Sequence, residues 1–469
     1  MADPTPLDVR RAGVLMHLTS LPSTDGQGDL GAEAYRFVDF LAAAECTVWQ
    51  VLPLVPTHEG DGSPYNSLSA MAGNPDLISH ELSAEHGLSG PASLDPQQLE
   101  GFRAWCEEQG HWLDPHVEFT ALRQLLGGRP WPTWEPLLRD RDAARVADVL
   151  APHADLTLAL RFEQWIFASQ WRSLREYAAA RGVLLFGDLP IFVSHDSADV
   201  WASRELFQLD PAGQPITVSG CPPDYFAVDG QRWNNPHYDW DAMARDDFAW
   251  WRARIARQRD LFDLVRIDHF RGFEAAWHVP IEAPTAREGH WVPGPDRAVL
   301  EALVETAGPG TLVAEDLGVI TPEVDALRHE FGLPGMKILQ FAFDGGQANP
   351  YLPHNHGEQS VVYTGTHDND TTVGWWSGLG EETRDQVRSV LIDPDESMPW
   401  ALIRLAFAST GRLAVVPAQD LLELDAASRM NTPGTDVGNW LWQAQPGAFD
   451  AVLAARVAAL VAESGRFPR

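Results

Sequence analysis

The sequence has 469 residues, 45% of them hydrophobic and 21% charged, and its formal net charge at pH 7 is −32. This length and mixed composition are typical of a large globular protein and exclude a disordered, collagen-like or coiled-coil chain. A chain this acidic repels phosphate backbones and anionic lipid surfaces. We therefore expect it to bind neither nucleic acid nor membranes.

The cysteines and the N-terminal residues indicate a cytoplasmic protein. Cys46, Cys106 and Cys221 stand at unrelated spacings that fit neither a disulfide framework nor a zinc site, as is usual in a reducing compartment. The first residues contain acids and arginines in place of the apolar core of a secretory signal. No apolar run is long enough to span a membrane.

Short apolar runs bounded by turn residues indicate eight β-strands. Their central residues are nearly continuous Val, Ile, Leu and Phe, as in parallel strands covered on both faces. Helical patterns follow most of them, and repeated strand–helix alternation is typical of a (β/α)8 barrel. The predicted strands are residues 13–17, 47–54, 183–192, 264–268, 311–315, 336–343, 360–367 and 413–419. The predicted helices are residues 32–44, 241–262, 296–307, 381–391, 400–409 and 448–464.

The chain is longer than the ~250 residues that a bare barrel needs. No Ser/Gly linker divides it, so we expect residues 1–469 to form one (β/α)8 domain with insertions near the C-terminal mouth of the barrel. Residues 80–160 carry Trp, Leu, Glu and Arg at helical spacing and predict a helical insertion. Residues 195–239 are rich in Pro, Gly, Asp and aromatic residues and predict a loop-rich insertion over the mouth, in which residues 219–232 show neither strand nor helix pattern.

Four predicted strands end in charged residues, at Asp188, at Arg266 and Asp268, at Glu315, and at Asp368. In barrels of this type such residues share one mouth and are catalytic. A single Asp after a strand is often only a helix N-cap, but several acidic clusters at comparable strand ends favour a shared site. Retaining glycosidases use two carboxyl groups about 5–5.5 Å apart, one as nucleophile and one as acid and base. Arg266 lies on the same strand face as Asp268 and would keep this aspartate ionised.

Longer motifs around these acids carry a family resemblance. They are Arg-Ile-Asp-His-Phe-Arg-Gly-Phe-Glu at 266–274, Ala-Glu-Asp-Leu-Gly at 314–318, Thr-Gly-Thr-His-Asp-Asn-Asp-Thr-Thr at 364–372, Ser-Pro-Tyr-Asn-Ser at 63–67, Pro-Pro-Asp-Tyr-Phe at 222–226 and Arg-Met-Asn-Thr-Pro-Gly-Thr at 429–435. In this order they resemble the signature segments of the 4-α-glucanotransferases, the amylomaltases or disproportionating enzymes of glycoside hydrolase family 77. The resemblance covers essentially the whole chain.

The resemblance implies an enzyme that transfers segments of α-1,4-glucans and maltooligosaccharides to the 4-hydroxyl of glucose or another glucan, with no cofactor and no metal. It implies that Asp268 is the nucleophile, that Glu315 is the general acid and base, and that Asp368 holds the substrate hydroxyls. The other residues that it implies for sugar binding are Tyr65, Asp188, His195, Tyr225, Arg266 and His367.

Other interpretations stay open at this point. An α-1,4-glucan hydrolase would use the same carboxylates, and a non-catalytic glucan-binding protein would lack one of them. Gly26, Gly28 and Gly31 match a dinucleotide-binding pattern, but no acid ends the next predicted strand, so we expect a tight turn there. His354 and His356 have the spacing of a metal pair, yet they lie in a loop and not at a strand end.

Overall fold

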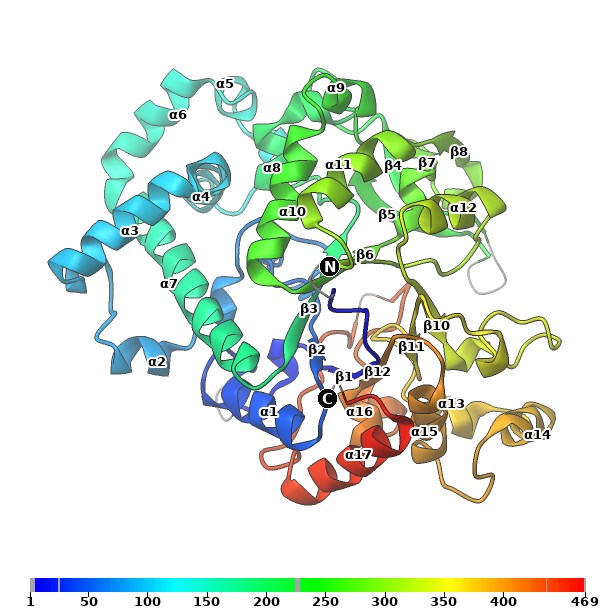
Figure 1. The fold of residues 1–469 in the computed structure, drawn as a ribbon. Coiled ribbons are helices and arrows are strands. Elements are labelled where there is room, and N and C mark those ends of the chain that lie inside the picture. The colour runs from blue at the N-terminus through cyan, green and yellow to red at the C-terminus, as the bar shows by residue number, and fades with distance from the viewer. Residues whose placement is uncertain (1–4, 24–25, 224–227, 436, 468–469) are drawn as a thin grey trace.

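A parallel β-barrel forms the centre of the molecule (Figure 1). The computed structural model describes residues 5–23, 26–223, 228–435 and 437–467. Eight parallel strands are hydrogen-bonded in the order β10-β11-β12-β1-β2-β3-β6-β9. One strand overlaps each predicted run, which confirms the (β/α)8 fold. The strands are β1 (Arg11–Leu15), β2 (Val48–Gln50), β3 (Leu184–Pro190), β6 (Leu264–Asp268), β9 (Leu312–Ala314), β10 (Gly335–Ile338), β11 (Ser360–Tyr363) and β12 (Leu413–Pro417).

The two outer strands of this order, β9 and β10, lie beside each other. The N–H of Ala314 in β9 donates a hydrogen bond to the carbonyl of Pro334, just before β10, over 2.9 Å. The sheet therefore curves into a barrel. One buried cluster takes a side chain from every strand, from Leu15 in β1 to Leu413 in β12, and fills the barrel interior. This double burial explains the continuous apolar runs in the sequence.

Helices surround the barrel and connect its strands (Figure 1). Five predicted helices overlap observed ones, which are α1 (Ala32–Ala43), α11 (Arg297–Ala307), α14 (Glu381–Val390), α15 (Trp400–Ala408) and α17 (Ala451–Ser464). Three helices that the sequence analysis did not predict follow β9, β11 and β12. They are α12 (Pro322–Glu330), α13 (Thr372–Gly378) and α16 (Ala418–Leu421).

The prediction of one continuous helix over residues 241–262 is wrong. Two helices, α9 (Trp240–Ala244) and α10 (Ala249–Leu261), occupy this region. Between them Asp247 and Phe248 have φ angles of 58° and 55°, in the left-handed region, which ends the helical hydrogen bonding. The Phe248 side chain is buried in the same core that both helices cover. The helical spacing of apolar residues therefore continues across the break, and the sequence pattern does not show where the helix is interrupted.

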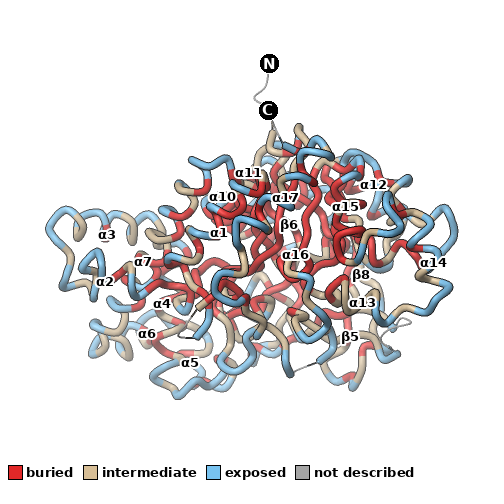
Figure 2. The backbone as a smooth tube through the Cα atoms, turned by 90° about the horizontal axis from the view of Figure 1, so that it is seen from below, coloured by how far each residue is buried: buried red, intermediate tan, exposed pale blue. Residues whose placement is uncertain are grey.

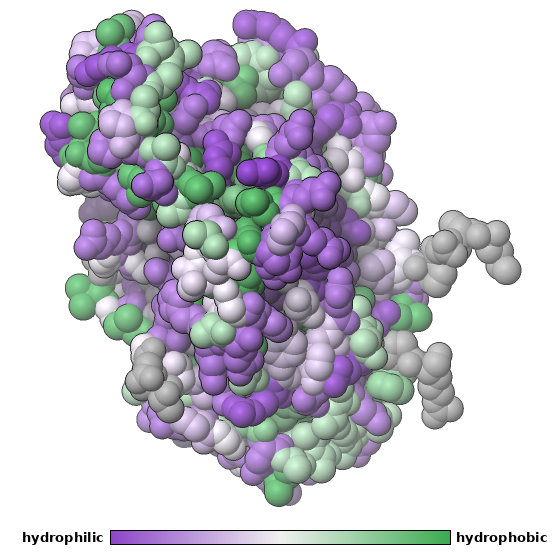
Figure 3. Space-filling model, turned by 90° about the vertical axis from the view of Figure 1, so that its left-hand side faces the viewer, coloured by the Kyte–Doolittle hydropathy of each residue, from purple (hydrophilic) through white to green (hydrophobic). Residues whose placement is uncertain are grey.

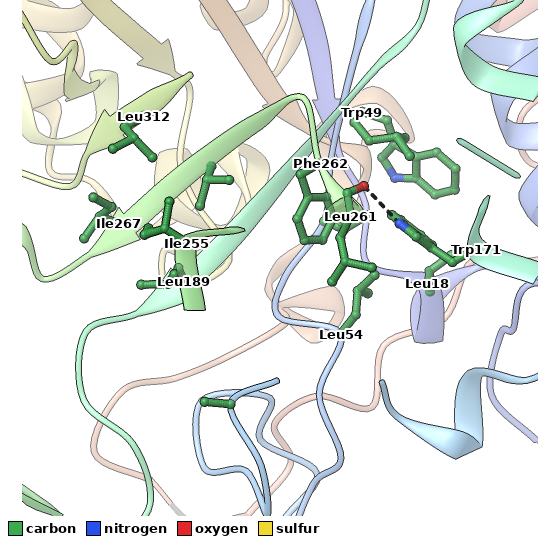
Figure 4. Packing of buried hydrophobic residues seen from close by; sticks show 14 of the residues in the cluster. Leu18, Trp49, Leu54, Trp171, Leu189, Ile255, Leu261, Phe262, Ile267 and Leu312 are labelled. Carbon is green, nitrogen blue, oxygen red and sulfur yellow. Dashed lines mark hydrogen bonds between the residues drawn. The ribbon is translucent and has the colours of Figure 1, made fainter. Parts of the chain in front are cut away.

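The helix α7 (Ala154–Ala179) fixes the strands that carry the acidic residues. Its Trp171 is buried, donates a hydrogen bond from Nε1 to the carbonyl of Leu261 over 3.0 Å, and meets the ring of Phe262 edge to face (Figure 4). Phe262 in turn packs directly on Gly187 in β3, where a Cβ atom would lie 2.2 Å from its ring. This contact joins α7 to the start of β6.

Helices fill most of the segment from residue 80 to β3 and form a lobe at one side of the barrel (Figure 1). Trp112 and Leu113 of this lobe belong to a small separate apolar cluster, whereas Phe102 and Val146 join the main core. Before α7 the helices of this lobe are α2 (His80–Glu85), α3 (Pro96–Glu108), α4 (Gly110–Leu125), α5 (Pro136–Arg139) and α6 (Ala143–Leu150).

Figure 2 shows exposed residues at α2 and α3 and buried residues at the barrel. Hydrophilic side chains predominate on the face seen in Figure 3. In the described ranges no helix is both long and apolar enough to cross a bilayer.

A second, antiparallel sheet lies beside the barrel mouth, with the strand order β5-β4-β7-β8. Its strands are β4 (Thr217–Cys221), β5 (Gln231–Pro236), β7 (Ala275–Pro280) and β8 (His290–Pro293), and the short helix α8 (Ala198–Ala202) precedes it. The expectation that residues 219–232 have no strand is therefore wrong at both ends of this segment. Its strands are short and partly polar, and β4 pairs with β7, which follows β6 in the chain. No local sequence pattern predicts pairing with a strand so far along the chain.

Candidate active site

The strand register brings the predicted acidic residues to one end of the barrel. Asp188 in β3 is the register partner of Arg266 in β6, and Asp268 ends β6. Ile267 is paired with Ala314 in β9, so Glu315 follows directly beside Asp268. Asp368 lies in the loop after β11.

Arg266 connects two of the carboxylates. Its Nη1 donates hydrogen bonds to both oxygens of Asp188, over 2.7 and 2.6 Å, and its Nη2 donates to Asp268 Oδ1 over 2.8 Å. The side chains of Arg266 and Asp188 are buried. Because a planar guanidinium fixes the direction of each bond, this arrangement sets the orientation of Asp268.

The surroundings of Asp268 shift the pKa of its carboxyl in opposite directions. Burial raises the pKa of this carboxyl, Arg266 lowers it, and the neighbouring carboxylates of Asp188 and Asp368 raise it, with a net shift above the ordinary aspartate range. Oδ1 is held by Arg266. Among the residues that the structure describes, none donates a hydrogen bond to Oδ2, which leaves this oxygen available to an electrophile.

Glu315 is the more strongly perturbed carboxyl. Burial raises its pKa, Asp268 adds to this, and Arg266 opposes it together with two backbone N–H groups. These groups are the N–H of His269, which donates to Oε2 over 2.7 Å, and the N–H of Leu317, which donates to Oε1 over 2.8 Å. His269 has a left-handed backbone with a φ of 53°, which is uncommon for a residue other than glycine. Glu315 is thus suited to hold a proton that Asp268 has lost.

Aromatic rings line one side of the acidic cluster. Tyr65 donates from its hydroxyl to Asp188 Oδ2 over 2.7 Å and stacks on His367, with ring centroids 5.2 Å apart. Trp440 lies against both rings. Burial raises the pKa of Tyr65 and lowers that of His367, so both are neutral near pH 7. Aromatic faces of this kind can pack against a sugar ring.

Trp440, Arg429 and Asn431 are site residues to which the sequence analysis gave no role. Arg429 donates to the carbonyl of Asp368, and Asn431 donates from Nδ2 to Asp368 Oδ1 over 2.6 Å. They lie in the irregular segment between β12 and α17, where no periodic pattern points to a function. The motif at 429–435 is the sequence signal that includes Arg429 and Asn431.

His195, one of the predicted sugar-binding residues, makes its contacts outside this cluster. His195 shares a hydrogen bond with the carbonyl of Gly213 over 2.7 Å and packs edge to face on Trp131. Both partners belong to the insertions, and sugar binding by His195 stays a prediction. Tyr225 lies outside the described residues.

The glycine pattern at residues 26–31 and the histidine pair at 354 and 356 both have local structural explanations. A Cβ atom on Gly28 would lie 2.2 Å from the carbonyl of Leu18, so this glycine permits a close approach of two chain segments. His356 has both ring nitrogens engaged, with Ser409 Oγ at 2.8 Å and the carbonyl of Tyr351 at 2.9 Å. His354 shares a hydrogen bond with the carbonyl of Gln347.

Comparison with known proteins decides the family. The family model described as 4-alpha-glucanotransferase, glycoside hydrolase family 77, matches residues 16–99 and 88–448. The chain belongs to this family. The 4-alpha-glucanotransferase of Thermus thermophilus is 44% identical over 97% of this chain and 99% of its own length. The enzyme of Synechocystis is also 44% identical, over 94% and 95% of the two chains.

Solved structures agree with this assignment to the 4-alpha-glucanotransferases. The amylomaltase from Streptococcus agalactiae in complex with acarbose matches with a TM-score of 0.92 and 33% identity, over 97% of this chain and 99% of that one. The amylomaltase from Corynebacterium glutamicum, at 19% identity and a TM-score of 0.76, shares the fold. Both the predicted family and the predicted enzyme class are confirmed, and the hydrolase alternative is not favoured.

Proposed function

We propose that this 4-alpha-glucanotransferase disproportionates maltooligosaccharides through a covalent glycosyl–enzyme intermediate, with retention at the anomeric carbon. The observation that carries the proposal is the contrast between two neighbouring carboxyls. Asp268 is oriented by Arg266, whereas Glu315 is buried and has its pKa raised towards the protonated form. A nucleophile and an acid side by side are the requirement of retaining chemistry.

In the first step Glu315 gives its proton to the oxygen of an α-1,4 bond while Asp268 Oδ2 attacks the anomeric carbon. The bond from this carbon to the leaving oxygen breaks, a bond to Asp268 forms, and the shortened glucan leaves with a free 4-hydroxyl. Asp368, His367, Tyr65 and Arg266 hold the reacting glucosyl unit in this account.

In the second step the 4-hydroxyl of glucose or another glucan attacks the same carbon. Glu315 takes the hydroxyl proton, and the bond to Asp268 breaks. One α-1,4 bond has replaced another, so the reaction is nearly thermoneutral and needs no cofactor. Attack by water would give hydrolysis, and the nature of the acceptor therefore separates the two activities.

The test is incubation of the purified chain with maltotriose in phosphate-free buffer that contains a chelator, followed by separation of the products by length. Glucose together with a ladder of longer maltooligosaccharides is the expected result. Glucose and maltose without longer products would contradict transfer and indicate a hydrolase. Absence of any product with maltotriose and longer donors would contradict the proposed substrate class.

We also propose that the enzyme works in the cytoplasm. The support is the set of three cysteines at spacings that suit a reducing compartment. Fractionation of the source cells, with the chain followed by antibody, tests this. Recovery outside the cytoplasmic fraction would contradict it.

A further inference from the structure

The segment after β12 returns to the barrel mouth and contacts the loop that carries Asp368. Asn431 donates from its side-chain Nδ2 to Asp368 Oδ1 over 2.6 Å, and its backbone N–H donates to the carbonyl of His367 over 3.1 Å. Arg429 donates to the carbonyls of both Asp368 and Asn431. A single short segment therefore holds both the side chain and the backbone of Asp368.

Asp368 is the most exposed carboxylate of the cluster. Its side chain is 43% exposed, compared with 28% for Asp268 and 0% for Asp188. Oδ1 faces Asn431 and, at 3.5 Å, His367 Nε2. Over the described ranges Oδ2 receives no hydrogen bond from the protein. The NH2 group of Asn431 is the side of the amide that faces Oδ1, since it is the donor of this hydrogen bond.

We propose that Asn431 is a positioning residue, which fixes Asp368 Oδ1 and thereby aims Oδ2 at a hydroxyl of the reacting sugar. The inference rests on the proposed function. Without this donor the exposed carboxylate can rotate away from the sugar. A hydrogen bond to a charged group has the strength to change the rate by roughly ten- to a hundredfold, so we expect Asn431→Ala to lower kcat/KM by that factor.

Several charged or titratable groups surround this contact. Asp268, His367 and Tyr65 all interact electrostatically with Asp368. Arg266 acts on His367 and binds Asp268, and Arg429 contacts the Asp368 backbone. These groups are the same in every variant proposed below, so a difference in pH dependence between variants reports on position 431.

The decisive variant is Asn431→Asp, which keeps the shape of the side chain and replaces the amide donor with a carboxyl. Two carboxyls in contact hold one proton between them, because the first charge opposes the second. While the proton is shared, the hydrogen bond to Asp368 persists. Its release at higher pH leaves two like charges in contact. The ratio of variant to wild-type kcat/KM should therefore fall as the pH rises, whereas the ratio for Asn431→Ala should not change with pH.

Asn439→Asp is the matched control. Asn439 lies in the same segment, accepts a hydrogen bond from the N–H of Thr432 over 2.9 Å and donates to the carbonyl of Thr435 over 2.8 Å. In the described chain Asn439 forms no hydrogen bond with Asp368. This control should keep the wild-type pH profile, because the charge that it introduces is not paired with Asp368.

The experiment measures maltotriose disproportionation over a pH series, with thermal melting to show that each variant is folded. A wild-type enzyme that does not disproportionate overturns the proposed function itself. With an active wild type, a pH-independent ratio for Asn431→Asp, or the same trend in Asn439→Asp, overturns the positioning role. If Asn431→Ala melts below the assay temperature, the isosteric Asn431→Asp alone decides.

Discussion

Arg266 binds Asp188 through both carboxylate oxygens, at 2.7 and 2.6 Å, with the Asp188 side chain fully buried. The two residues are register partners in the neighbouring strands β6 and β3. The second guanidinium nitrogen is therefore directed at Asp268, which it reaches over 2.8 Å. The direction of the proposed nucleophile thus depends on a carboxylate from another strand.

Arg266→Lys should lower kcat by at least about a hundredfold, because a single ammonium group cannot bind Asp188 at two oxygens and Asp268 at the same time. The measurement is the initial rate of maltotriose disproportionation. Arg466→Lys is the control, since Arg466 is equally buried but binds the carbonyls of Phe407, Ser409 and Gly411. It should lower Tm and leave kcat unchanged. Equal losses of kcat in both variants would contradict the role of Arg266.

The pH profile of kcat/KM should be bell-shaped. In the proposed mechanism activity requires Asp268 ionised, so the rate rises with pH through the pKa of this group, which lies above the ordinary value of about 3.9. The same mechanism requires Glu315 protonated, so the rate falls as the pH passes the raised pKa of this carboxyl. An alkaline limb that persists with a donor whose leaving group needs no protonation would contradict this assignment to Glu315 in the first step.

Azide should distinguish the two carboxyls through the anomer that it forms. In Glu315→Ala with an α-glucosyl fluoride donor, Asp268 still forms the intermediate, and azide then replaces it to give the α-azide. In Asp268→Gly azide takes the place of the nucleophile and gives the β-azide. NMR of the products identifies the anomer. The reverse assignment of anomers would mean that the two roles are exchanged.

Tyr65 should show two separable contributions. Tyr65→Phe keeps the ring that stacks on His367 and removes the hydroxyl that donates to Asp188, which Arg266 still holds at both oxygens. We expect kcat/KM to fall about tenfold. Tyr65→Ala also removes the aromatic face and should fall further, mainly through KM. Equal values for both variants would show that the ring makes no contribution to binding.

The barrel strands could be predicted because each is buried on both faces, and this leaves a continuous apolar run such as that of Val361 to Tyr363. The acidic residues could be predicted because they follow such runs directly. The second sheet could not be predicted, since β4 obtains its hydrogen bonds from β7, far along the chain. Its stability depends on that pairing and not on a local pattern.

The contributions of Asn431 and Trp440 escaped prediction for a different physical reason. Both lie in an irregular segment, and they contact Asp368 and Tyr65 only because the chain returns to the mouth there. Trp440 even adopts a left-handed backbone, with a φ of 65°, which no sequence preference of Trp favours. The resemblance at residues 429–435 identified this segment as a family motif but did not predict what its residues contact.

The central claim is that Asp268 forms the covalent intermediate, and the most direct test is to isolate it. Glu315→Ala, which lacks the base for the second step, is incubated with an α-maltosyl fluoride, and the modified peptide is identified by mass spectrometry. The account predicts one maltosyl group on the peptide that contains residues 264–268, attached at Asp268. It predicts no maltosyl group on the double variant that carries both Glu315→Ala and Asp268→Asn. A maltosyl group on a different residue, or release of fluoride with no labelled protein at any time, would contradict it.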